Sequence, residues 1–366
     1  MISFRVRSGF IAGAALLAPA CAPEPSPPAA PPPSPAVRAS AETDPVASAE
    51  DAADDPAIWI HPEDPARSLV LGTDKQLGLN VYRLDGVRAQ FLPSGRLNNV
   101  DVRQAVTLGA YAGDVAGAGD RSDNTVVLFA IAPDGAVAEA GRFASAIAEP
   151  YGFCLGLPGG RLTAFVTHKT GEIIAYEPDA FSSARVTARL KLSSQLEGCV
   201  FDDKAGVLYV GEEAVGVWRF EYAGAATPAP ALIDRVGSET RLAADVEGLA
   251  IYAIDERRGY LLASSQGNSI FTVYDRERPN AYRGRFVVAD GGGLRGDIDG
   301  VAETDGVEAT SAPLGPDYPK GVFIAQDGFN ADPDTGGPSP QNFKIIDWRA
   351  IEEALGLQPA EASNRP

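Results

Sequence analysis

The sequence contains few of the residues that bind soft metals or take part in histidine-dependent phosphoryl transfer. Its 366 residues include two histidines, three cysteines and one methionine. So low a histidine count nearly excludes a multi-histidine zinc site and any phosphatase that depends on several histidines. Soft-metal chemistry is disfavoured too, because thiolate and thioether ligands are scarce. If a metal binds, oxygen ligands make calcium or magnesium the expected ion.

Positive charge is also in short supply. The chain has 31 lysine and arginine residues against 49 aspartate and glutamate residues, and its formal net charge is −18. A surface of this sign repels nucleic acid and anionic membranes, so we expect neither as a partner. The same excess of carboxylates favours the binding of metal cations.

The N-terminal apolar run is too short to span a bilayer. It reads FIAGAALLAPA at residues 10–20 and follows Arg5 and Arg7, an arrangement typical of a secretory signal. We therefore expect residues 1–21 to direct export. The protein would be secreted, periplasmic or lipid-anchored to the cell envelope.

The end of this signal allows two outcomes. Cys21 follows Ala18-Pro19-Ala20, so the cysteine is a candidate for lipidation. The leucine usually found three positions before a lipidated cysteine is replaced by Ala18, which leaves simple cleavage after Ala20 as the alternative.

Segments rich in proline and alanine flank the rest of the chain. Residues 22–45 are predicted to be a disordered linker and residues 358–366 a disordered tail. The folded domain is therefore expected over residues 46–357, as a monomer by default. Cys154 and Cys199 are expected on inner strands of neighbouring repeats, as two buried thiols rather than a disulfide, although export would permit the bond.

Sustained helical periodicity is missing as well, apart from a short stretch at residues 347–355. The chain instead contains an internal sequence repeat. Its clearest copies are QLEGCVFDDKAGVLYVGEE (195–213), DVEGLAIYAIDERRGYLLASSQGN (245–268) and ETDGVEATSAPLGPDYPKGVFIAQDG (303–328), and three looser copies precede them. The anchor residues of the six copies are Asp55, Asp101, Tyr151, Glu197, Glu247 and Asp305, at spacings of 46, 50, 46, 50 and 58 residues. Six repeats of short apolar strands and Gly, Pro and Asp turns predict an all-β protein, a six-bladed β-propeller.

The repeat also predicts where the anchors lie. Too few strands follow the sixth anchor to complete a blade, so we expect residues 38–50 to complete it and close the ring. The innermost strands of a propeller line a central channel, and anchors at their starts should converge at one mouth. Asp245 and Glu247 alternate onto one face of their strand and should join this ring. One such residue would more often be a turn former, but a ring of carboxylates repels itself without counterions, which favours divalent cations.

Polar residues also follow the second strand of each copy, 16 to 22 residues after the anchors. They are Lys75, Arg121 and Lys169 in the first three copies, and Glu213, Gln266 and Gln326-Asp327 in the last three. One mouth would thus carry a basic half beside an acidic half. Such a surface suits a substrate with several phosphates, because cations can bind some of them while metals on the carboxylates activate others.

The motifs around these positions form an ordered series. They are DDPAIW (54–59), TDK (73–75), NNVDVR (98–103), RSDNT (121–125), YGF (151–153), LEG (196–198), GEE (211–213), DVEGL (245–249), LLASSQGNS (261–269), ETDGV (303–307), LGPDYPKGVFIAQDG (314–328) and QNFK (341–344). The series resembles that of the β-propeller phytases, calcium-dependent alkaline enzymes that hydrolyse myo-inositol hexakisphosphate (phytate). The resemblance covers nearly the whole expected domain.

The resemblance implies a 3-phytase in which a water activated by calcium attacks the phosphate directly, with the calcium salt of phytate as the preferred substrate. The catalytic calcium ions and the water would be held by Tyr151, Glu197, Asp245, Glu247 and Asp305. Phosphates would be bound by Lys75, Arg121 and Lys169. Glu213 and Gln266 would lie at the rim of the same metal cluster. Calcium that braces the fold would be held by Asp54, Asp55, Asn99, Asp101, Gln326 and Asp327.

Two positions depart from the family pattern. Gln76 replaces a second lysine, and His168 stands before Lys169 where a small residue is common. Either change would weaken phosphate affinity or alter the pH profile, and neither removes a metal ligand. Two other functions stay open: a propeller lactonase or esterase with a single calcium, which the three basic positions disfavour, and a calcium-braced binding module without enzymatic activity.

Overall fold

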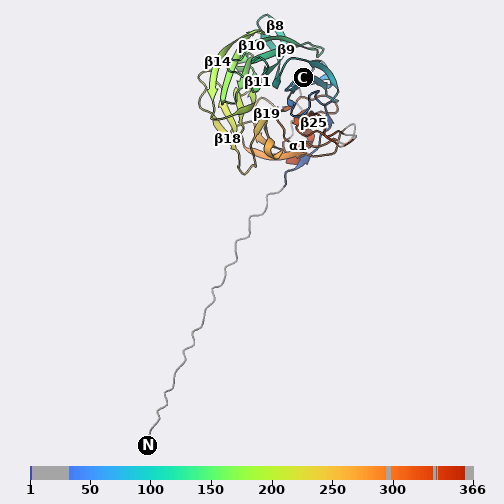
Figure 1. Ribbon diagram of the computed structural model, residues 1–366, viewed down its shortest axis with the longest axis vertical. Coiled ribbons are helices and arrows are strands. Elements are labelled where there is room, and N and C mark those ends of the chain that lie inside the picture. The colour runs from blue at the N-terminus through green and yellow to red at the C-terminus, as the bar shows by residue number, and fades with distance from the viewer. Residues whose placement is uncertain (2–32, 294–297, 333–334, 336, 359–366) are drawn as a thin grey trace. The chain divides into compact units, whose positions relative to one another are not determined.

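Six sheets follow one another along the chain from Ser34 onward (Figure 1). The computed structural model describes Met1 and residues 33–358, except for residues 294–297, 333–334 and 336. The predictions for the export signal with Cys21, for residues 22–32 of the linker and for nearly all of the tail therefore concern residues outside the described part.

The first four sheets each contain four consecutive strands. They are β3 (Ala53–Trp59), β4 (Leu69–Asp74), β5 (Gly78–Arg83) and β6 (Arg88–Leu92); β7 (Leu97–Leu108), β8 (Tyr111–Asp120), β9 (Thr125–Ile131) and β10 (Val137–Ala144); β11 (Gly152–Gly156), β12 (Thr163–Thr167), β13 (Glu172–Ala180) and β14 (Ser183–Lys191); β15 (Leu196–Asp202), β16 (Val207–Glu212), β17 (Gly216–Glu221) and β18 (Ala231–Arg235).

The last two sheets combine strands from both ends of the chain. The fifth contains β19 (Val246–Ala253), β20 (Gly259–Ser265), β21 (Ile270–Asp275), β22 (Tyr282–Val288) and β1 (Ala36–Val37); the sixth contains β23 (Val307–Thr310), β24 (Val322–Asp327), β25 (Asn342–Asp347) and β2 (Ala41–Glu42). Short 3-10 turns occur at Pro65–Arg67, Pro158–Gly160 and Gln266–Asn268.

The first strand of each sheet is the inner one. Each of these strands contacts the next, and β23 contacts β3, so the inner strands form a closed ring. In Figure 1, β11 and β19 lie toward the centre while β14 and β18 lie at the periphery. The predicted six-bladed propeller is confirmed.

The chain ends close the ring as the repeat count predicted. In β2, Ala41 pairs with Ile345 and Glu42 with Lys344, which supplies the fourth strand of the sixth blade. Strand β1, which pairs in parallel with β22, was not predicted. Both strands lie ahead of residue 46, within the segment predicted as linker.

Helix α1 (Trp348–Leu355) occupies the stretch where helical periodicity was detected. Asp347 caps its N-terminus by accepting a hydrogen bond from the backbone of Arg349 at 3.0 Å. Trp348 is fully buried and stacks on Tyr252 of β19 with ring centroids 3.5 Å apart. The helix thereby packs on the fifth and sixth blades. Among the described residues no helix has the length and apolarity needed to cross a membrane.

Apolar side chains fill the spaces between neighbouring blades. Between the first and second blades, for example, Trp59, Leu71, Val81 and Phe129 are at most 1% exposed and form one cluster. Each blade thus covers an apolar face of its neighbour.

Cys154 and Cys199 form a disulfide, so the expectation of two free thiols is wrong. Cys154 lies on β11 and Cys199 on β15, and their Cα atoms are 5.7 Å apart, a separation that a disulfide bridges without backbone movement. The inner strands of adjacent blades approach each other closely beside the channel, which the sequence pattern did not reveal.

We expect the double variant Cys154→Ala/Cys199→Ala to lose about 2–4 kcal/mol of unfolding free energy, because the bond closes a long loop in the unfolded chain. Urea denaturation in non-reducing buffer measures the loss, and reduction of the native protein should reproduce it. Unchanged midpoints after both treatments would contradict this contribution.

Candidate active site

A shared irregularity of the inner strands positions one side chain per blade. In four blades the pairing of the inner strand skips two residues at the same place, and the first skipped residues are Asp54, Asn98, Glu197 and Glu247. Such bulges turn a side chain out of the regular alternation of the strand. In the other two blades Tyr151 and Asp305 lie shortly ahead of β11 and β23. These six residues line one cavity of about 1340 Å³ at the channel mouth.

The anchors predicted for the first two blades were wrong in register. Asp54 and Asn98, rather than Asp55 and Asp101, occupy the mouth. Asp55 and Asp101 lie beyond it and line a small cavity of about 20 Å³ together with Asn99 and Glu308. The loose copies lack the Glu-Gly pair of the fourth and fifth, so the alignment slipped by one residue in the first blade and by three in the second.

Close packing between neighbouring inner strands explains why a glycine follows the anchor in the fourth and fifth blades. A Cβ on Gly198 would lie 2.1 Å from the carbonyl oxygen of Glu247, and a Cβ on Gly248 would lie 2.6 Å from the backbone nitrogen of Val307. At these two positions the inner strands of adjacent blades approach so closely that a residue with a side chain would not fit. This contact holds the carboxylates of successive blades near one another.

The residues after the second strands reach the same cavity, as predicted for Lys75, Arg121, Lys169, Glu213 and Gln266. In four of the five, the backbone nitrogen donates a hydrogen bond to the carbonyl oxygen of the residue two positions before the anchor, for example Glu213 to Gln195 at 3.1 Å and Gln266 to Asp245 at 3.0 Å. Gln326 lies behind the mouth and accepts a hydrogen bond from the backbone of Asp305 at 2.8 Å. Asp327 belongs to another cluster, around Lys344.

Several residues of the cavity were missed from the sequence. Arg96, Asn98, Gln195 and Glu303 are among them. Arg96, Gln195 and Glu303 each precede the anchor of their blade by two residues, as Asp245 precedes Glu247. The equivalent position of Asp245 in the repeat could therefore have identified them.

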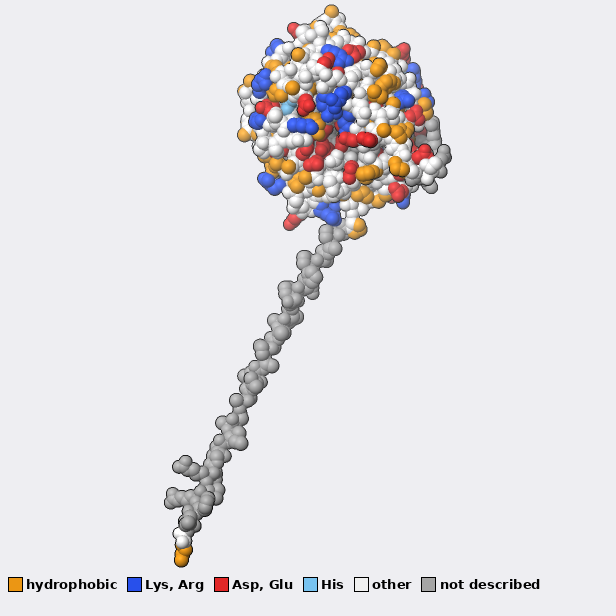
Figure 2. Space-filling view, viewed as in Figure 1, with side chains coloured by type: hydrophobic (Ala, Val, Ile, Leu, Met, Phe, Trp, Pro, Cys, Tyr) orange, Lys and Arg blue, Asp and Glu red, His pale blue; other side chains and the backbone are white. Residues whose placement is uncertain are grey.

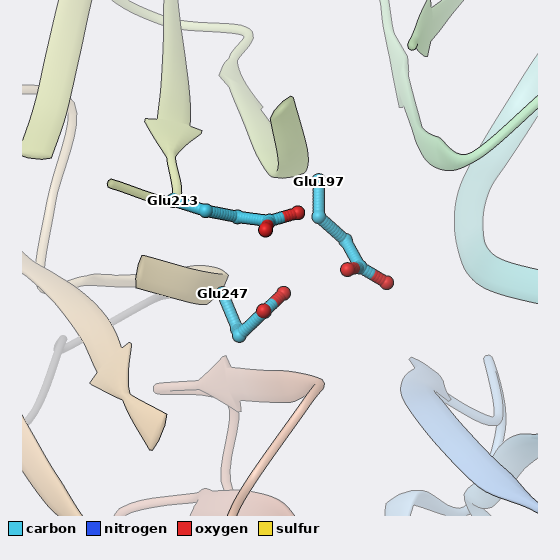
Figure 3. Close-up of side chains that lie close together, drawn as sticks. All are labelled: Glu197, Glu213 and Glu247. Atoms are coloured by element: carbon cyan, nitrogen blue, oxygen red, sulfur yellow. The ribbon is translucent and has the colours of Figure 1, made fainter. Parts of the chain in front are cut away.

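Three carboxylates lie together in the acidic half of the mouth. Glu197, Glu213 and Glu247 each present an oxygen within 4.8 Å of the others, and Figure 3 shows the three side chains pointing toward a common space. All three are buried, and Asn98 donates a hydrogen bond to Glu197 Oε1 at 2.8 Å. Within the described part of the chain, Glu213 Oε1 and Glu247 Oε2 have no hydrogen-bond partner. Buried, unpartnered carboxylate oxygens of this kind fit a hard divalent cation.

The electrostatics of the cluster agree with this fit. Burial raises the pKa of Glu213 to about 7. Burial and the neighbouring Glu197 raise the pKa of Glu247 well above its usual range. A nearby cation would oppose these shifts, because an opposite charge favours the ionised form.

Lys75 links the acidic residues of the first and sixth blades. Its Nζ lies 2.8 Å from Asp305 Oδ2, 3.3 Å from Asp54 Oδ1 and 2.6 Å from Asp51 Oδ1. Burial lowers the pKa of Lys75, but the carboxylates outweigh it and the net pKa is raised. Gln266 also donates a hydrogen bond to Asp305. Asp305 is therefore held in place from two sides.

The basic half of the mouth stands next to the acidic half. The Nζ of Lys169 lies 4.3 Å from the ring centroid of Tyr151, a cation–π contact. Arg96 and Arg121 line the same cavity. Figure 2 shows basic side chains gathered directly beside acidic ones at the centre of this face. The predicted pairing of a basic with an acidic half is present.

Of the two residues that depart from the family pattern, one lines the cavity and the other does not. Gln76 lines the cavity and donates a hydrogen bond to the carbonyl oxygen of Ala49 at 3.2 Å. His168 is buried, and burial lowers its pKa, so that it is neutral near pH 7. Its side chain does not line the cavity.

Comparisons with known proteins identify relatives of this chain. A family model described as Phytase matches residues 9–364. A Bacillus subtilis (strain 168) protein named 3-phytase is 41% identical over 336 residues, which cover 88% of this chain and 86% of that protein. A solved structure described as a putative gluconolactonase is 14% identical, covers 85% of this chain and 93% of its own, and has a TM-score of 0.50. The β-propeller domain of Cps50 (Swd1) from Myceliophteria thermophila is 13% identical, covers 81% and 83%, and has a TM-score of 0.44. At 14% identity the putative gluconolactonase resembles this chain in fold alone.

Proposed function

This chain belongs to the phytase family, and from that premise we propose that it is a 3-phytase whose mouth cavity binds phytate together with calcium ions. It hydrolyses the phosphomonoester bonds of phytate and releases inorganic phosphate. The observation that carries the proposal is the mouth itself, where buried carboxylates face lysine and arginine residues across one cavity.

The carboxylates and their neighbours are the proposed calcium ligands. Glu197, Glu213 and Glu247 form the centre of the set, and the ligands Tyr151, Asp245, Asp305 and Gln266 surround them in the same cavity. When bound, calcium would neutralise charge on a phosphate and lower the pKa of a water molecule. Asp54 joins this set, since it lies at the mouth rather than deeper in the channel.

The chain's own residues bind and orient the substrate. Lys169 and Arg121, with Arg96 beside them, attract phosphates to the basic half. Tyr151 keeps the ammonium of Lys169 over its ring while lying next to Glu197. One phosphate can then lie against the carboxylate half while others contact the cations.

Calcium that braces the fold is proposed deeper in the channel. Asp55, Asn99 and Asp101 line the small cavity there. Asp101 is paired with Arg103 at 2.8 Å and Asp55 accepts a hydrogen bond from the backbone of Val100 at 3.1 Å. Gln326, behind the mouth, would support Asp305 rather than bind a metal directly.

The proposal is tested by phosphate release from phytate at neutral to mildly alkaline pH in the presence of calcium, with p-nitrophenyl phosphate as comparison. We expect release from phytate and little from the small ester, because the latter carries a single phosphate and cannot span both halves. Equal rates on both substrates would contradict the proposed role of the basic half. No release from phytate would overturn the assignment.

Lys169→Gln should raise the KM for phytate by about 10- to 100-fold with a smaller change in kcat. The substitution removes a charged phosphate contact, which contributes roughly 1.5–3 kcal/mol. Initial-rate kinetics measure the effect, and Lys204→Gln is the control, since Lys204 is exposed and pairs with Glu256 away from the mouth. A fall in kcat at unchanged KM would place Lys169 outside substrate binding.

We also propose that the protein is exported, acts as a monomer and binds phytate as its calcium salt. The disulfide suits an oxidising compartment outside the cytoplasm. Mass spectrometry of the mature N-terminus would distinguish a lipidated Cys21 from an unmodified one, and a retained signal would contradict export.

A further inference from the structure

In the second and fourth blades, a buried acidic residue ends the second strand. Asp120 ends β8 and Glu212 ends β16, and both are 0% exposed. Neither lines the mouth cavity, although the residue that follows each of them, Arg121 or Glu213, does. A buried carboxylate is costly unless donors replace the water that it loses. The donors that these two carboxylates bind therefore show which parts of the mouth they support.

Asp120 connects the two segments that carry arginines of the mouth. Its Oδ1 accepts hydrogen bonds from the backbone nitrogen of Arg96 at 3.0 Å and from that of Ser122 at 2.7 Å. Ser122 follows Arg121, whose own backbone nitrogen donates a hydrogen bond to the carbonyl oxygen of Arg96 at 3.0 Å. One carboxylate thus fixes the separation of the two arginine backbones.

Arg142 of β10 supports the same carboxylate. Its Nη1 lies 2.5 Å from Asp120 Oδ2, and its Nη2 donates a hydrogen bond to the carbonyl oxygen of Ser94 at 2.8 Å. Ser94 precedes Arg96 by two residues in the loop that leads into β7. Both oxygens of Asp120 therefore bind donors, and its buried charge is paired. Arg142 itself does not line the cavity.

Glu212 holds the acidic half in an equivalent way. Its Oε1 accepts hydrogen bonds from the backbone nitrogens of Ser193 at 3.0 Å and Ser194 at 2.7 Å, and from both serine hydroxyls. Its Oε2 accepts one from Trp218 Nε1 at 2.7 Å. The serines directly precede Gln195, which lines the cavity and whose carbonyl oxygen binds the backbone nitrogen of the residue after Glu212.

We propose that the two carboxylates are positioning residues, each acting on the half of the mouth that its own blade supplies. Asp120 sets the spacing of Arg96 and Arg121 for the binding of phosphate. Glu212 sets the position of Glu213 for the binding of calcium. The inference rests on the proposed function of the mouth, because phosphate and calcium are the ligands proposed there.

Asp120→Asn tests the basic half. Asparagine cannot accept hydrogen bonds at both ends of its side chain, so the variant loses either the contact with Arg142 or those with the backbone. We expect the KM for phytate to rise about 10-fold, with kcat and the calcium dependence nearly unchanged. Arg142→Gln removes the outer support of the same carboxylate and should shift KM in the same direction, even if Asp120→Asn does not fold.

Glu212→Gln tests the acidic half and should give the opposite pattern. The glutamine amide would face the indole of Trp218 or the donors of the two serines, so one set of hydrogen bonds is lost. We expect calcium binding at the mouth, measured by equilibrium dialysis without substrate, to weaken about 10- to 100-fold. The KM for phytate at saturating calcium should stay near the native value. Trp218→Phe removes the donor to Oε2 and should weaken calcium binding by a smaller factor.

Asp202→Asn is the matched control. Asp202 is 2% exposed, accepts hydrogen bonds from the backbone nitrogens of Lys204 at 3.1 Å and Ala205 at 3.0 Å, and lies 2.5 Å from Arg276 Nε. It has the same kind of surroundings as Asp120, but it ends β15 and does not line the mouth cavity. The control should lose stability and keep the native KM and native calcium binding.

Kinetics and binding together decide the inference. A native KM in both Asp120→Asn and Arg142→Gln would overturn it, as would native calcium binding in both Glu212→Gln and Trp218→Phe. Equal shifts in Asp202→Asn would also overturn it, because the effects would then come from lost stability. Phytate binding measured by calorimetry separates this inference from the proposed function. No phosphate release by the native protein would contradict the function, whereas weaker phytate binding in Asp120→Asn than in Asp202→Asn would still support the positioning role.

Discussion

Glu247→Gln is expected to lower the kcat for phytate by roughly 100- to 1,000-fold, the usual loss when one charged group that stabilises a transition state is removed. Glutamine has the shape of glutamate, so the bulge in β19 and the contact of Gly248 with the next blade should survive. What is lost is one negative charge among Glu197, Glu213 and Glu247, whose oxygens lie within 4.8 Å of one another.

Kinetic measurements on this variant distinguish an effect on calcium binding from an effect on the hydrolysis step. Initial rates are recorded against phytate at several calcium concentrations, because a weakened ligand set should shift the calcium dependence upward as well as lower kcat. Glu353→Gln, on the exposed face of α1, is the matched control and should behave as the native enzyme. Native rates and native calcium dependence in Glu247→Gln would remove the three-carboxylate cluster from the mechanism.

The sequence predicted the propeller because its repeats are local and periodic. The pattern of an anchor, a turn and a second strand recurs often enough to count blades, and the short supply of strands after Asp305 pointed to residues 38–50 for closure. It also predicted that Lys75, Arg121 and Lys169 would meet Glu213 and Gln266, because equivalent positions in a rotational repeat share one mouth.

The errors arose at residues whose positions are determined by contacts between blades rather than by the periodicity of the sequence. Asp55 and Asp101 were chosen as anchors although the bulges place Asp54 and Asn98 at the mouth. A β-bulge shifts the pairing register of a strand, and the pattern of apolar residues in the sequence does not show where the bulge occurs. The disulfide between Cys154 and Cys199 depends on the approach of two inner strands. The contact of Lys344 with Glu42 joins segments that lie about 300 residues apart, and Asp327 pairs with the same lysine.

Removal of calcium is expected to have the largest effect of all, a fall in phytate turnover of about 1,000-fold or more, since several kcal/mol of charge stabilisation would be lost. Without a cation the mouth presents buried carboxylates to an anionic substrate. Burial already raises the pKa of Asp305 and of Glu213 to about 7. Repulsion of phosphate and protonation of the ligands would therefore both act against the reaction.

The experiment measures phosphate release before EDTA, after EDTA and after calcium is restored, with circular dichroism recorded at each step. Recovery with calcium but little with magnesium would agree with a flexible cluster of carboxylates, because magnesium demands a stricter octahedral geometry. Lost activity with an intact spectrum would locate the effect at the mouth, whereas parallel loss of structure would locate it in the proposed calcium deeper in the channel. Full turnover in EDTA would contradict the calcium proposal while leaving family membership untouched, and the lysine and arginine residues would then have to bind the phosphates without metal.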